Sequence, residues 1–281
     1  MRVLVLSLIL AVPVVVRAQR CDDGPLSLAA ADILESGTVD VVAAARSRGS
    51  TLPWVRALWV SDRAELRVDT FLEGVSARAG APIVCGEALS EGRRLVLAGA
   101  RAATLTLLAG LATVELAEGW REARLYAHDS RGETWEQAVE GGRAEIPSDL
   151  TPPIDVQVVA TGPDGPRPVA DARIGRGRAL VIVRSGEPIV VRVDHLREAA
   201  DAGSLRTNRL LTRGAARHAA TICRDGNVAH VVDGADPIER LAREGIVARH
   251  VGETAARSSD LEHAYAATLR SPSHWSARAA S

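Results

Sequence analysis

Residues 93–108 read RRLVLAGARAATLTLL, and this stretch indicates the type of secondary structure in the middle of the chain. Arg93–Leu97 and Thr104–Leu108 are two short runs rich in Leu, Val and Thr, separated by a segment that contains Gly99. Short apolar runs bounded by glycine are typical of strands joined by turns. Similar runs continue from Ala112 to Val169, so we predict a small β-sandwich or β-rich layer.

The residues before this β-rich part favour helices. Residues 26–48 are rich in Ala and Leu, and residues 62–79 carry apolar side chains at helical spacing. That spacing places the apolar side chains on one face, so two helices are predicted here.

Proline and glycine mark the turns of the β-rich part. We interpret residues 148–153 and 162–168 as turns or linkers, because Pro and Gly fix backbone angles that regular elements reject. A hairpin is predicted from Ala179–Val183 and Pro188–Val193, folded about residues 185–187.

From Asp194 onward the pattern is helical. Steps of four, four and three place a set of apolar residues on one helix face: Leu211, Ala215, Ala219 and Ile222. Residues 259–262 carry capping chemistry and predict another helix, ending near Arg270.

Residues 236–239, Asp-Pro-Ile-Glu, predict the start of a further helix. Asp236 can accept from the free backbone amides, Pro237 fits the first turn, and Glu239 can reach back to the cap. Gly245 is suited to end this helix. The side chains expected on its inner face are Ile238, Leu241 and Ala242.

Three motifs occur in order in this helical part. They are Ala229-His230 followed by residues 234–246, then Val-Gly-Glu-Thr-Ala at 251–255, then Ser-Pro-Ser-His-Trp at 271–275. Together, over about residues 194–281, they resemble the bacterial branch of the CAP superfamily, the SCP-like extracellular domains. In that family a His follows the first long helix, a Gly-Glu-Asn segment comes next, and Ser-Pro-Gly-His follows the last helix.

The chain departs from the family pattern at several points. Thr254 stands where the family usually has Asn, and Ser273 where it usually has Gly. The family's domain also continues into strands that complete a central sheet, whereas this sequence stops at Ser281. We therefore expect a truncated CAP-like domain that lacks its C-terminal strands, or a sheet completed by another segment of the chain.

The resemblance implies a cleft lined by His230, Glu253 and His274, with Ser271 where eukaryotic members carry a second acid. Two imidazoles and a carboxylate suit a divalent metal, so zinc held by His230 and His274 is the cofactor that this set suggests. His250 is the rival ligand.

The first residues have the pattern of a secretory signal peptide. Met1-Arg2 precedes an apolar stretch that ends at Val16, and Ala18 is the small residue before the expected cut. We predict a signal peptide at 1–18, secretion to the periplasm or outside the cell, and no transmembrane segment after cleavage.

The charge balance and the cysteines give information on the possible partners and on the disulfide. The 34 basic residues are all Arg and face 35 acidic ones, and this balance implies neither nucleic acid nor an acidic membrane as a partner. Cys21 and Cys85 are the expected disulfide, with Cys223 left as a buried thiol. Three free cysteines are the alternative.

The sequence therefore predicts an α+β protein. After the signal peptide, residues 19–175 would form a helical and β-rich domain, and residues 176–281 a partial αβα-sandwich CAP-like domain. The expected function is non-enzymatic binding of a small apolar ligand, a metal ion or an extracellular partner. A metal-assisted hydrolase of peptide or cell-wall material is the alternative, although no Ser-His-Asp order or Cys-His pair supports it. Enzyme activity is thus left open.

Overall fold

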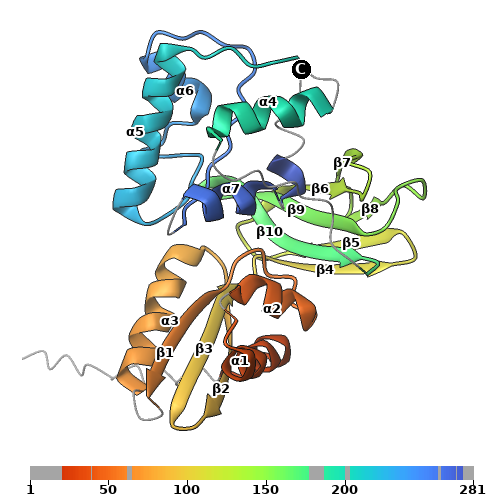
Figure 1. The fold of residues 1–281 in the computed structure, drawn as a ribbon, viewed down its shortest axis with the longest axis vertical. Helices are drawn as coiled ribbons and strands as arrows, with labels where there is room; N and C mark the ends of the chain where they lie inside the picture. Colours follow the sequence, from red (N-terminus) through yellow and green to blue (C-terminus); the bar gives the residue numbers. More distant parts are fainter. Residues whose placement is uncertain are drawn as a thin grey trace, which may run out of the picture.

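The computed structural model describes residues 21–38, 40–61, 65–176, 187–199, 203–258, 261–269 and 271–274. The signal peptide predicted at 1–18 lies outside these residues. The chain is a mixed α+β protein, as predicted. A helix-covered sheet lies at one end, a β-sandwich in the middle, and a group of helices at the other end (Figure 1).

The first part is a three-stranded antiparallel sheet of order β1-β3-β2 with helices on both faces. Leu95 and Leu97 of the central strand β3 pack under α1 and α2, whereas Val96 and Ala98 pack under α3. Because successive strand residues point to opposite faces, one apolar strand supplies two cores. Its elements are α1 (Gly24–Ser36), α2 (Val41–Ser47), β1 (Arg56–Ser61), α3 (Glu65–Ala79), β2 (Ile83–Ser90) and β3 (Arg93–Ala100).

Local signals explain why residues 26–48 form two helices instead of one. Gly37 ends α1 in the left-handed conformation at φ 69°, and Asp40 then caps α2 by accepting from the amide of Ala43. Strand β1 was not predicted from the sequence. Its partner β3 decides its conformation, because all six β1 residues pair with that strand.

The predicted disulfide joins Cys21 to Cys85 on β2, with the two Cα atoms 4.5 Å apart. This prediction is confirmed. Cys223 is free as expected, but it is exposed on the surface of its helix and not buried. The apolar character of cysteine suggested burial, whereas the orientation of the helix decides exposure.

The predicted β-sandwich is present. Sheets of order β4-β5-β8 and β10-β9-β6-β7 face each other across one apolar cluster that includes Leu105, Val114, Leu125 and Val158. The strands are β4 (Ala103–Leu108), β5 (Leu111–Leu116), β6 (Arg121–His128), β7 (Thr134–Ala138), β8 (Arg143–Glu145), β9 (Ile154–Gly162) and β10 (Gly165–Ile174).

The interpretation of residues 162–168 as a linker was wrong. Strands β9 and β10 run through this segment and pair from Gly162 and Gly165 onward, so its turn is only Pro163-Asp164. Pro166 and Pro168 are tolerated because β10 is an edge strand of its sheet. Residues 148–153 do form a connection between strands, as predicted.

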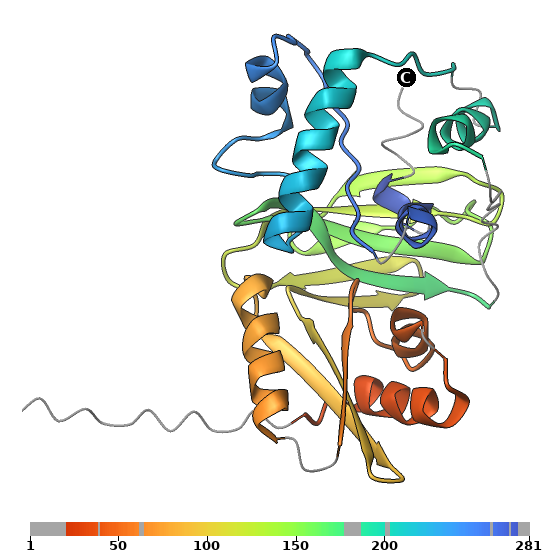
Figure 2. The ribbon, with the colours of Figure 1, turned by 60° about the vertical axis from the view of Figure 1, so that its left-hand side comes forward.

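The described residues after β10 form helices and contain no strand: α4 (Ile189–Ala199), α5 (Arg209–Asp225), α6 (Pro237–Arg243) and α7 (Leu261–Leu269). This corrects the predicted hairpin. Residues 189–193 belong to α4, and the other predicted strand of the hairpin lies outside the described residues. The partial αβα sandwich predicted for residues 176–281 stays a prediction. Figure 2 shows α7 lying over the sandwich between α4 and α5.

The predicted helix faces are only partly turned inward, through Ile222 of α5 and the half-buried Leu241 of α6. Leu211, Ala215 and Ala219 of α5 are exposed, and the buried α5 side chains are His218 and Ile222. In α6 the predicted capping box of Asp236 and Glu239 is present, yet Ile238 and Ala242 are exposed. Spacing identifies a helix face, but only the packing partner decides which face turns inward.

Among the described residues, none of the helices combines the length and apolarity that crossing a membrane requires.

Candidate functional site

The predicted cleft is partly assembled around Glu253. The Nδ1 of His230 lies 2.8 Å from Glu253 Oε1. An ionised carboxylate can only accept, so Nδ1 of His230 carries the proton that is donated to Glu253. The structure thus brings two of the predicted residues together as a carboxylate–imidazole pair.

Arg240 completes the surroundings of Glu253. Its guanidinium pairs with the second carboxylate oxygen and also donates to the backbone carbonyls of His230 and Ala235. Burial opposes ionisation of Glu253, but the bonds from His230 and Arg240 outweigh burial and hold the pKa of this carboxyl below its ordinary value. Arg240 therefore fixes both the charge of Glu253 and the backbone that carries His230.

His218 is the third group around Glu253. Its Nε2 lies 3.4 Å from the same Oε1 that His230 contacts. Neither buried ring nitrogen makes a hydrogen bond of full geometry among the described residues. Burial lowers the pKa of His218, and the Glu253 carboxylate and the backbone of Ala229 oppose this shift. A buried imidazole with a shifted pKa beside a carboxylate marks this cluster as a candidate site.

The neighbouring elements position the cluster from three directions. Helix α5 carries His218 and ends at Gly226, after which Asn227 bonds Asp164 in the β9–β10 turn at 3.0 Å. The amide of Val231 also bonds the Asp164 carbonyl at 3.1 Å. The segment that carries His230 is thereby held against the end of a rigid hairpin.

Ser271 is held at a different place on the sandwich. The hydroxyl of Ser271 bonds Gln157 in β9 at 2.7 Å, and His274 follows in the same helical turn. Gln157 precedes Gly162, at the end of β9, by five residues, which is about 17 Å of strand. His230 packs near that end, beside Gly165, so Ser271 is anchored away from the His230–Glu253 pair.

Across the described part of the chain, no group of three or more His, Cys, Asp or Glu side chains is arranged to hold a metal ion. The Nδ1 of His230 is taken up by the bond to Glu253. His250 is exposed and belongs to neither location.

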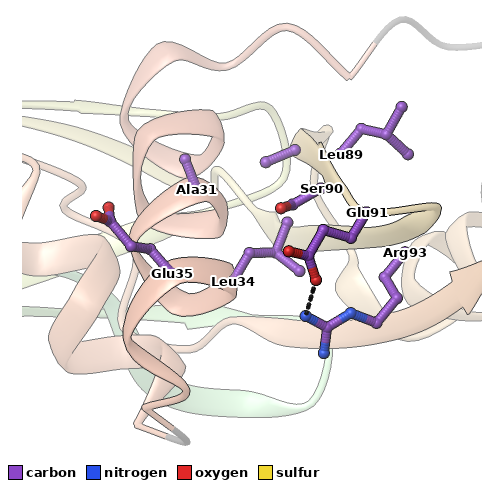
Figure 3. Close-up of a pocket in the computed structure, with 8 residues that line it drawn as sticks. Ala31, Leu34, Glu35, Leu89, Ser90, Glu91 and Arg93 are labelled. Carbon is purple, nitrogen blue, oxygen red and sulfur yellow. Dashed lines mark ion pairs between the residues drawn. The ribbon is translucent and has the colours of Figure 1, made fainter.

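A surface hollow lies elsewhere, between α1 and the end of the β2–β3 hairpin (Figure 3). Ala31 and Leu34 of α1 face Leu89 and Ser90 of the hairpin across it. The pair Glu91–Arg93 at its rim spans 3.8 Å between highly exposed side chains. This hollow holds none of the predicted site residues.

The sequence analysis did not include His218 or Arg240 in the cleft. His218 had a usable signal, since it lies four residues before the buried Ile222 on α5. Arg240 had no such signal, because the sequence of a helix does not show whether an arginine is exposed or faces inward.

No family model, no curated protein and no solved structure matches the chain. Fold and site therefore define a class only: an α+β protein with a disulfide-linked α/β unit, a β-sandwich and a helical group that carries a His-His-Glu-Arg cluster. The CAP resemblance stays a prediction from its motifs.

Proposed function

We propose that the chain is an exported, non-enzymatic module that binds an extracellular protein through its C-terminal helices. The observation that carries this proposal is the poor internal packing of that region. All three apolar clusters of the described structure are formed by residues up to Ile174.

Helices α4–α7 and their connections bury few apolar side chains of their own. In the described residues from 187 onward the buried ones are Ile222, Ala229, Ala235, Tyr265 and Leu269. Large apolar side chains that stay exposed there include Val190, Val191, Leu205, Leu211, Ile238, Val247 and Leu261. We take these side chains as the surface for a partner, because a partner that covers them would remove apolar surface from water.

Two further observations support the proposal. The Cys21–Cys85 disulfide suits an oxidising compartment, in keeping with the predicted signal peptide. The cluster around Glu253 supplies an imidazole but no nucleophile bonded to it, which favours binding over the hydrolase alternative. Its polar lining also disfavours the small apolar ligand, and the CAP-like motifs support the same extracellular setting.

Site-specific photo-crosslinking tests this function. A photoreactive residue at Val247, which is 98% exposed, should crosslink one defined protein when the full chain is secreted by its natural host. The same probe at Thr106 on the sandwich is the control. The variant Leu211→Glu/Ile238→Glu should lose the crosslink. Crosslinking that is absent, or equal at Thr106, would overturn the proposal.

A further inference from the structure

A chain of buried polar side chains crosses the outer face of the four-stranded sheet. Gln157 of β9 and Asp171 of β10 stand opposite each other in register. Only 3% of Gln157 and 4% of Asp171 is exposed. Val156 and Val158 fill the sandwich core, so the alternation of β9 turns Gln157 to the opposite face.

This chain has two ends that are remote in the sequence. At one end the guanidinium of Arg46, on α2, pairs with Asp171. At the other end Gln157 Oε1 accepts from the hydroxyl of Ser271 at 2.7 Å and from that of Ser273 at 2.5 Å. In the middle Gln157 Nε2 donates to Asp171 Oδ1 at 2.9 Å.

The chemistry of these groups makes the links depend on one another. A carboxylate accepts only, so Asp171 forces the NH₂ of Gln157 to face it and the amide oxygen to face the serines. Burial raises the pKa of Asp171, while the charge of Arg46 and the bond from Gln157 oppose that shift. Without Arg46 the buried carboxylate loses its counter-charge, and the orientation of Gln157 is no longer fixed.

We infer that Arg46, Asp171, Gln157, Ser271 and Ser273 form a polar relay that couples the docking of α2 to the docking of the C-terminal turn at 271–274. Loosening either end leaves buried polar groups unpaired along the relay and thereby loosens the other end. The relay is distinct from the partner-binding function proposed above and does not depend on it.

Hydrogen exchange of the full chain, followed by mass spectrometry, tests the relay. Arg46→Met should speed exchange in α7, residues 261–269, by about tenfold, a size typical of coupling within one hydrogen-bond network. The matched control is Arg48→Met, because Arg48 bonds Asp32 at the surface, at 2.6 Å, from the end of the same helix. This control should leave α7 unchanged.

The reverse experiment uses the other end of the relay. Because coupling is reciprocal, Ser271→Ala/Ser273→Ala should speed exchange in α2, residues 41–47, whereas exposed Ser258→Ala should not. Strands β4 and β5 serve as the internal reference and should keep their exchange rates. Two results would overturn the relay: loosening of only the mutated end, or an equal rise over the whole chain including β4 and β5.

Discussion

His230 and Glu253 form a direct hydrogen bond of 2.8 Å although 23 residues separate them in the sequence. The same carboxylate oxygen lies 3.4 Å from His218, and the other oxygen pairs with Arg240. One acidic side chain thus organises two imidazoles and a guanidinium. Its charge state should control how well α5, α6 and the segment around Glu253 stay together.

Replacing Glu253→Gln should lower the free energy of unfolding at neutral pH by about 1–2 kcal/mol, since charged hydrogen bonds are lost in a partly buried place. The pKa of Glu253 in the folded protein lies below its ordinary value of 4.5. Its stabilisation is therefore present above that value and is lost as the pH falls through the folded pKa. Urea unfolding of both proteins should give stabilities that converge as the pH falls below the folded pKa of Glu253. A pH-independent difference would contradict this.

His218 should make the protein less stable in mild acid. Burial holds its pKa in the folded state below the ordinary value of 6.5, so the unfolded chain binds the proton more readily. Stability should rise with pH between the folded pKa and 6.5, and His218→Gln should remove that part of the slope. An NMR titration of the imidazole that gave a folded pKa above 6.5 would refute the assignment.

The disulfide should contribute strongly to stability, because it closes a loop with a sequence separation of 64 residues. Chain entropy predicts a loss of about 4 kcal/mol for Cys21→Ser/Cys85→Ser. Denaturant unfolding with and without a reducing agent measures this loss. Cys223→Ser is the control and should change little, as that thiol is free and exposed.

Two glycines should respond to alanine with opposite signs. A Cβ at Gly86 would lie 2.3 Å from the backbone nitrogen of Ser27, so Gly86→Ala should push α1 away from β2 and cost roughly 2 kcal/mol or more. Gly74 lies inside α3 with nothing near its Cβ position, so Gly74→Ala should stabilise by up to about 1 kcal/mol. Thermal unfolding of both variants measures the two changes in stability. Two shifts of the same sign would show that the contact at Gly86 does not limit packing.

Zinc should not raise the thermal stability of the protein. Among the described residues, no group of three or more His, Cys, Asp or Glu side chains is arranged to hold a metal ion. A thermal-shift series with zinc, run on the wild type and on His230→Ala, tests this. A rise in the wild type that disappears in the variant would restore the metal hypothesis.

Local sequence chemistry determined several parts of this protein. The period of the β-rich segment predicted the sandwich, and the Asp-Pro-Ile-Glu segment predicted the start of α6 at Pro237. The pairing of Cys21 with Cys85 was also predicted. The strands and the helix start depend on backbone preferences and capping, which can be seen within a short stretch of sequence. The disulfide depends on the choice of a pair among three cysteines.

The tertiary structure alone decided which surfaces turn inward and which distant residues meet. The apolar spacing of α5 identified a face from Leu211 to Ile222, and the packing of α5 buries only Ile222 of that face, together with His218. The fold also decided the partners of the motif residues, since Gln157 holds Ser271 and Glu253 holds His230. The physical reason is that the path of the whole chain decides which groups come within reach of a side chain. From the sequence alone, two polar groups that can form the same hydrogen bonds are equally good candidates for its partner.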